Sequence, residues 1–111
     1  MENNGENSYM EKILSFGKLP YNWNENKAEA IPKNVIDKSI HFVSELSEIP
    51  DMFPTARDSI QIEYEKPKGN YLEFEIFSDK ILYYLDTNLE EEEGMNPSKD
   101  KIEELLKRFH L

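Results

Sequence analysis

The sequence predicts a single α+β domain over residues 1–111, with two N-terminal helices, a three- to four-stranded antiparallel β-meander and a C-terminal helix. Two observations predict this class. From Ser59 to Leu85, apolar and polar residues alternate, which is typical of strands with one buried and one solvated face. Before and after this segment, apolar residues recur at spacings of three and four, which is typical of helices that cover a sheet.

The N-terminal part predicts a loose start, a short helix and an irregular arm. Residues 1–7 are polar, and the apolar residues that follow fall near helical spacing until Gly17 offers a stop. The arm covers residues 19–26. Its Tyr21 and Trp23 would be costly to expose, so we expect both side chains to hold the arm against the core. The alternative for Trp23 is an exposed anchor for a partner, because tryptophan is enriched at binding hot spots.

The main helix is predicted between Pro32 and Pro50. Proline suits the first turn of a helix, and apolar residues then repeat at helical spacing: Val35, Ile36, Ile40, Val43 and Leu46. His41 lies on the solvated side. We interpret it as a surface residue and not as a metal ligand or general base, because no cysteine or second histidine is near it. Residues 51–57 then predict a short edge strand, where Pro54 is tolerated.

The meander itself is predicted from three segments. Residues 60–65 and 72–76 alternate, and residues 66–70 supply the turn between them. Residues 81–85 are apolar on both sides, which predicts the most enclosed strand. Antiparallel counting from a Glu65–Tyr71 pair gives three opposed pairs, namely Tyr64 with Leu72, Glu63 with Glu73 and Gln61 with Glu75.

This register predicts an acidic sheet face with like charges opposite each other, at a cost of up to about 1 kcal/mol when solvated. Three explanations are open. The repulsion is tolerated and spread over neighbours such as Lys66 and Lys80; or the face binds a cationic partner; or a carboxylate pair catalyses hydrolysis or holds two metals. The candidate partner-binding residues are Glu63, Glu65, Glu73, Glu75, Trp23 and Tyr21.

The C-terminal part predicts an acidic linker over residues 89–96 and a helix over residues 97–110. Four consecutive glutamates, Glu90 to Glu93, would repel one another, and they lack the Asp, Asn and Gly spacing of a calcium loop. The helix carries an apolar stripe at Ile102, Leu105, Leu106 and Phe109. We expect this stripe to dock on its own sheet and the protein to be a monomer, the alternative being a dimer formed through this helix.

Composition narrows the classes of function. A formal charge of -10 disfavours direct nucleic-acid binding and anionic membranes, and it favours a basic protein surface as partner. No cysteine is present, no apolar run approaches the roughly 18 residues of a membrane span, and the N-terminus has no signal-peptide pattern. We therefore expect a cytoplasmic protein. The sequence has no phosphate-binding loop, nucleophile motif or metal-ligand spacing, so we expect no cofactor, metal or catalytic residue.

Over residues 21–84 the chain resembles a family of small uncharacterised bacterial proteins. The resemblance is carried by Trp23-Asn24, Ile31-Pro32 opening a helix, the strands 58–64 and 72–76, and Asp79 and Tyr83. The chain departs from the family pattern at Tyr64, where the pattern has Trp, at Lys80, where it has Gly, and in its acidic linker and last helix. The resemblance implies a small α+β domain and no established activity.

Together these observations favour a small, acidic, non-enzymatic module that binds a basic partner and inhibits it, by class-level analogy with antitoxins, immunity proteins and phage-encoded nuclease inhibitors. One alternative is a structural or accessory domain. The other is a carboxylate-dependent hydrolase, for which the predicted solvent-facing sheet lacks an enclosing pocket.

Overall fold

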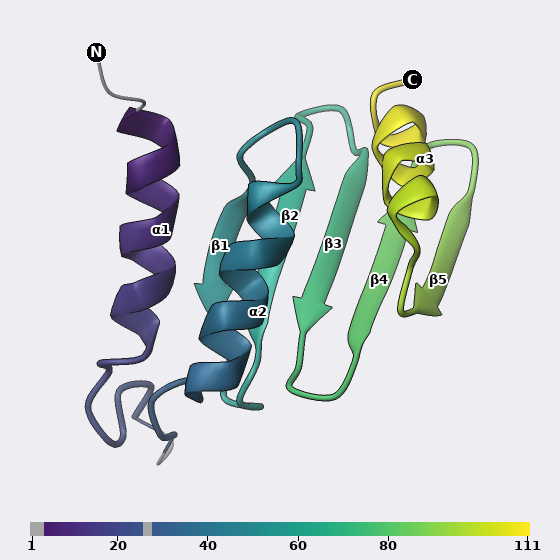
Figure 1. Cartoon of the computed structure of the whole chain (residues 1–111). Helices are drawn as coiled ribbons and strands as arrows, with labels where there is room; N and C mark the ends of the chain where they lie inside the picture. Colours follow the sequence, from purple (N-terminus) through teal and green to yellow (C-terminus); the bar gives the residue numbers. More distant parts are fainter. Residues whose placement is uncertain (1–3, 26–27) are drawn as a thin grey trace.

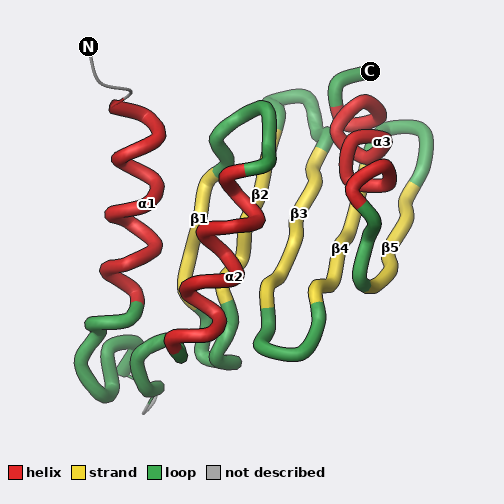
Figure 2. The backbone as a smooth tube through the Cα atoms, viewed as in Figure 1, coloured by secondary structure: helices red, strands yellow, loops and turns green. Residues whose placement is uncertain are grey.

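The computed structural model describes residues 4–25 and 28–111 and has an α+β fold with three helices and one antiparallel sheet (Figures 1 and 2). The elements are α1 (Asn4–Phe16), α2 (Lys33–Ser44), β1 (Asp51–Pro54), β2 (Ile60–Glu65), β3 (Tyr71–Ile76), β4 (Ile81–Asp86), β5 (Glu91–Met95) and α3 (Lys99–Phe109). Within the described ranges, no helix is long and apolar enough to cross a bilayer.

The sheet is a five-stranded meander in the order β1-β2-β3-β4-β5. The predicted register between β2 and β3 is confirmed, because Glu63 lies opposite Glu73 and Gln61 opposite Glu75. Helices α2 and α3 lie on the same face, α2 against β2 and β3 and α3 against β3 and β4, whereas α1 packs on α2 (Figure 1). Two layers therefore form, and no helix of residues 4–25 and 28–111 covers the second face of the sheet.

The core lies between the sheet and these helices. Alternation along β2 and β3 directs Ile60, Ile62, Leu72, Phe74 and Ile76 into it, all with no exposed surface. From α2, the ring of Phe42 meets the ring of Phe74 with 5.0 Å between centroids. The predicted helix positions Ile40 and Leu46 are only half-buried and pack at the edge of this core.

Two predictions for the N-terminal part are wrong. Helix α1 begins at Asn4, so most of the expected loose start over residues 1–7 is helical, and residues 1–3 lie outside the described part. The arm does not bury its aromatic rings in the core. Tyr21 is 60% exposed, and Trp23 is half-buried, with its indole N–H donating to the carbonyl of Glu29 at 2.6 Å. The arm thus folds onto its own backbone; its residue 26 is not described.

The predicted acidic linker over residues 89–96 is also wrong, because residues 91–95 form the strand β5. Alternation separates the glutamates. Glu91 and Glu93 point to the face without helices, whereas Glu92 points to α3, where Lys101 and Arg108 pair with it at 2.7 and 2.8 Å. The glutamates, which would repel one another in a linker, are thus divided between the two faces of the sheet. On the helix side, Lys101 and Arg108 neutralise Glu92.

Gly94 permits this strand to sit against β4. A Cβ atom at residue 94 would lie 2.6 Å from the ring of Tyr83, which crosses β5 to donate its hydroxyl to Glu92 at 2.7 Å. Only glycine leaves room for that ring.

Strand β4 is not the most enclosed strand, contrary to the prediction from its apolar residues. Five of its six residues are half-buried, whereas β3 is buried at Leu72 and from Phe74 to Ile76. Leu82 and Tyr84 point to the face without helices, and on the other face Ile81 and Tyr83 are also only half-buried.

Helix α3 docks on its own sheet, as predicted. Ser98 caps it by accepting from the backbone N–H of Lys101 at 3.1 Å, and the side-chain amide of Asn70 donates to the carbonyl of Phe109 at 2.8 Å. Of the predicted stripe, Leu105, Leu106 and Phe109 are buried and Ile102 is half-buried.

Candidate functional site

The sheet face opposite α2 and α3 is the candidate site, and we call it the open face. Alternation and register place fourteen strand residues on it: Asp51, Phe53, Gln61, Glu63, Glu65, Tyr71, Glu73, Glu75, Leu82, Tyr84, Asp86, Glu91, Glu93 and Met95. Eight of them are aspartate or glutamate, and none is lysine or arginine. The face therefore carries mostly acidic side chains, with apolar and aromatic ones among them.

Cross-strand pairing arranges these side chains in rows that run across the sheet. One row crosses all five strands as Asp51, Glu63, Glu73, Tyr84 and Glu93. Directly opposed side chains lie close together, so the like charges of this row repel one another in the free protein. The next row, Phe53, Gln61, Glu75, Leu82 and Met95, is mostly apolar or neutral.

Hydroxyl and amide donors moderate the repulsion between Glu63 and Glu73. The hydroxyl of Tyr71 donates to a carboxylate oxygen of Glu73 at 2.6 Å and lies 3.1 Å from a carboxylate oxygen of Glu63. This oxygen of Glu63 also accepts from the side-chain amide of Gln61 at 3.0 Å. Burial and these two carboxylates raise the pKa of Tyr71 above its ordinary value. The hydroxyl therefore stays a proton donor and leaves the negative charges in place.

Tyr84 is held in a similar way. It donates its hydroxyl to Glu91 at 2.7 Å, and this hydrogen bond, with some burial and the nearby charge of Asp86, raises the pKa of Tyr84 to about 12. The rings of Tyr71 and Tyr84 lie 6.4 Å apart between centroids. The centre of the acidic face thus carries two tyrosine rings fixed by their own carboxylates.

Glu75 differs from the other predicted face residues, because it is buried. Its carboxylate accepts from the hydroxyl of Ser59 at 2.5 Å and from Arg57 at 2.8 Å, and so it ties the β1–β2 loop to β3. It is the only open-face carboxylate that is ion-paired with a cation in the described part of the chain. Glu75 is thus a structural residue, whereas Glu63 and Glu73 are half-buried and Glu65 is exposed.

We predict that Glu75→Ala lowers the free energy of unfolding by about 1–3 kcal/mol, because it removes the buried carboxylate that accepts from Ser59 and Arg57 and leaves Thr55 as the remaining partner of the Ser59 hydroxyl. The matched control Glu73→Gln keeps a polar side chain and relieves repulsion, so its effect should stay within a few tenths of a kcal/mol. Urea denaturation of both variants measures this. Equal losses would show that Glu75 has no special structural role.

The remaining candidates are placed elsewhere. Tyr21 and Trp23 belong to the loop between α1 and α2 and are not part of the open face. The two lysines expected to offset the acidic charge are engaged with rings: the ammonium of Lys66 lies 5.2 Å from the ring centre of Phe109, and that of Lys80 lies near Phe77. Neither lysine forms an ion pair with a described carboxylate of the face.

Sequence reasoning did not assign six of the fourteen residues to this face. The pairing of β4 with β3 places Leu82, Tyr84 and Asp86 on it, and the pairing of β5 with β4 adds Glu91, Glu93 and Met95. The available signal was the alternation within residues 91–95, in which every second side chain shares a face once the segment is taken as a strand.

On the helix side, Glu92 is the centre of an ion-pair network. It accepts from Lys101, from Tyr83 and from Arg108, while Arg108 also pairs with Glu90. These three hydrogen bonds, of which that from Lys101 contributes most, lower the pKa of the Glu92 carboxyl from 4.5 to about 2. The network joins β5 to α3.

This lowered pKa predicts a pH dependence. The folded protein keeps Glu92 ionised at a pH where the unfolded chain is already protonated, so its contribution is complete above pH 4.5 and is lost as the pH falls towards 2. The stability difference between the parent and Glu92→Gln should therefore shrink over this window. Denaturation midpoints between pH 2 and 6 measure this stability difference. Glu93→Gln, on the other face of β5, is the control, and its stability difference from the parent should change less over the same pH range.

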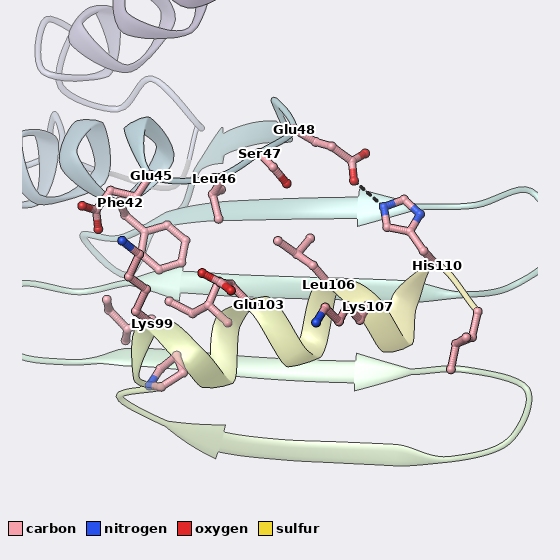
Figure 3. A pocket seen from close by; sticks show the side chains of 14 residues that line it. Phe42, Glu45, Leu46, Ser47, Glu48, Lys99, Glu103, Leu106, Lys107 and His110 are labelled. Carbon is pink, nitrogen blue, oxygen red and sulfur yellow. Dashed lines mark hydrogen bonds and ion pairs between the residues drawn. The ribbon is translucent and has the colours of Figure 1, made fainter.

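On the helix side of the sheet, a groove lies between the C-terminal end of α2 and α3 (Figure 3). It has a volume of about 820 Å³ and is lined by apolar side chains that include Phe42 and Leu106. His110 contacts Glu48 at one end. The rim carries both signs of charge, from Glu45, Glu103, Lys99 and Lys107. Its charges therefore indicate no particular occupant, and the groove is not our candidate site.

In the ranges that the structure covers, no group of three or more His, Asp or Glu side chains is arranged to hold a metal ion. No protein-family model, curated protein or solved structure matches the chain. The resemblance to small bacterial proteins therefore stays a prediction, and the functional argument depends on the geometry of the open face.

Proposed function

We propose that this protein binds a basic protein surface through its open face. The observation that carries the proposal is a whole face of a five-stranded sheet that bears eight carboxylates, of which one is paired with a described cation, and that no helical layer covers. A cationic surface is the partner whose charge complements it.

The energetics of the free protein support this proposal. Opposed carboxylates such as Glu63 and Glu73 repel each other when the face is free, and bound lysine or arginine side chains would remove that cost. The uniform sign of charge would also speed encounter with a basic partner. The relief of repulsion and the faster encounter both favour association, and neither stabilises the free folded protein.

The proposed mode of action is inhibition in a reducing compartment such as the cytoplasm. A basic protein surface that binds nucleic acid or another polyanion cannot do so while this face covers it. Because α3 buries its apolar stripe within its own chain, we propose that the protein acts as a monomer.

The test compares two variants with the same change in net charge. The face variant carries Glu63→Gln, Glu65→Gln and Glu93→Gln, and the control carries Glu11→Gln, Glu29→Gln and Glu103→Gln, which are exposed and lie outside the sheet. All three proteins are used to capture partners from an extract of the native cell. The partner captured from the extract is then purified, and its affinity for the parent, the face variant and the control is measured at two salt concentrations.

We expect the parent and the control to bind one basic protein with similar affinity, and the face variant to bind it at least about tenfold more weakly. Association should also depend less on salt for the face variant. If the face and control variants lose affinity equally, only net charge matters and the proposed site is wrong. A captured partner that binds the face variant as well as the parent would also contradict the proposal.

A further inference from the structure

The open face contains a hollow of about 350 Å³ where β3, β4 and β5 lie side by side. Two neighbouring rows of the sheet, each with one side chain from each strand, line it together with Tyr83 and Gly94. One row is Glu73, Tyr84 and Glu93, and the other is Glu75, Leu82 and Met95. The hollow is thus lined by two apolar side chains and by carboxylates from β3 and from β5.

The apolar part of this hollow is unusual on a face that is otherwise acidic. Leu82 is half-buried, Met95 is 59% exposed, and both lie on the side of the sheet without helices. Their position explains why β4 is apolar on both of its faces. Charge alone would not require a leucine and a methionine here, and the two side chains match a ligand group that has an apolar part as well as a charge.

The carboxylates around the hollow are not equivalent. Glu75 is engaged by Ser59 and Arg57, and Glu73 accepts one hydrogen bond, from Tyr71. Glu93 has no ion pair with any described residue. Between Glu73 and Glu93 lies Tyr84, whose ring is held in place by the hydrogen bond from its hydroxyl to Glu91. Acceptors for a cation thus flank an immobilised aromatic ring.

We propose that this hollow receives an arginine side chain of the basic partner, an inference that rests on the proposed function of the open face. The methylene stem of arginine matches Leu82 and Met95, and its guanidinium group matches the Tyr84 ring together with Glu73 and Glu93. Arginine fits better than lysine, because a guanidinium is planar, stacks on aromatic rings, is weakly hydrated and bonds carboxylates through two donors at once.

The first test needs no partner protein. The full chain with labelled leucine and methionine methyl groups is titrated with N-acetylarginine amide, and its NMR spectrum is compared with titrations by the lysine and norleucine amides. The expected result is saturable shifts of the Leu82 and Met95 methyl signals, with arginine binding about two- to fivefold more tightly than lysine, because only the guanidinium stacks on the ring and bonds a carboxylate through two donors at once. Norleucine should bind more weakly than both.

Matched variants locate the effect. Glu93→Gln and Tyr84→Leu should each weaken binding of the arginine amide by at least about twofold, because each removes one contact with the guanidinium. Glu65→Gln, on the same face but outside the hollow, should leave it unchanged. Shifts that centre elsewhere on the protein, equal binding of arginine and norleucine, or equal effects of Glu65→Gln and Glu93→Gln would each overturn the proposal.

Affinity measurements with the captured partner distinguish a failure of the arginine hollow from a failure of the proposed function on which it rests. In complex with the captured basic protein, Leu82→Ser should weaken affinity by at least about fivefold, and the control Leu89→Ser, at an 88% exposed leucine in the β4–β5 turn, should not. If the face variant loses binding while Leu82→Ser does not, the open face is the binding site and the arginine hollow is wrong. If the face variant keeps full binding, the proposed function itself fails.

Discussion

Phe74→Ala should lower the free energy of unfolding by about 3–5 kcal/mol, the range found when a fully buried phenylalanine is truncated. Phe74 has no exposed surface, lies in the middle of the central strand β3, and meets the ring of Phe42 from α2. Its loss leaves a cavity where the sheet and α2 pack on each other. Urea or guanidinium denaturation, read by far-UV circular dichroism, measures the change.

Two matched variants test whether this effect comes from the core. Phe53→Ala removes the same group from a side chain that is 44% exposed on the open face, so the loss should be about 1 kcal/mol or less. Ile40→Ala should have an intermediate effect, because Ile40 is only half-buried at the edge of the core. If Phe74→Ala unfolds at the parent's midpoint, the sheet does not pack on α2.

Removal of residues 97–111 should cost roughly 5 kcal/mol or more, since burial of each large apolar side chain contributes about 1.5–3 kcal/mol and α3 buries Leu105, Leu106 and Phe109. It also takes Lys101 and Arg108 away from Glu92. A loss of this size is most of the stability of a typical small domain, so we expect the truncated chain to lack a cooperative unfolding transition.

The control for this truncation is Leu111→Ala, which changes a residue that is 89% exposed, keeps the backbone carbonyl that accepts from Asn70, and should leave the midpoint unchanged. Analytical ultracentrifugation of the full chain should show a monomer, because the stripe is already buried. A full-length dimer that became a folded monomer after truncation would show that the stripe packs between two copies in solution.

What the sequence determined by itself is the local geometry. Alternation in residues 60–65 and 72–76 defined two strands and their register, and the spacing of apolar residues defined α2 and α3. These predictions succeed because the periods of two and 3.6 residues follow from backbone geometry, which each segment carries without its neighbours. The opposed pair Glu63 and Glu73, the first indication of the open face, follows from the same local rule.

Only the tertiary structure decided which carboxylates are paired within the protein and which are available to a partner. The run from Glu90 to Glu93 looks repulsive in the sequence and becomes a strand because Lys101 and Arg108, brought back by α3, pair with the side chains on one face. Glu75 resembles its neighbours in the sequence and becomes structural because the β1–β2 loop brings Arg57 and Ser59 to it. The energy of a charge depends on groups that are distant in sequence and close in space, and alternation along one strand does not contain them.

The same reason applies to the apolar residues of β4. The sequence determined that Leu82 and Tyr84 share one side of the strand, but not whether that side is covered. The placement of both sheet-packing helices, α2 and α3, on the other face left these two side chains beside Glu73 and Glu93. Their surroundings, and with them the hollow on the open face, were decided by the packing of whole layers, because burial is a property of the assembled fold and not of a segment.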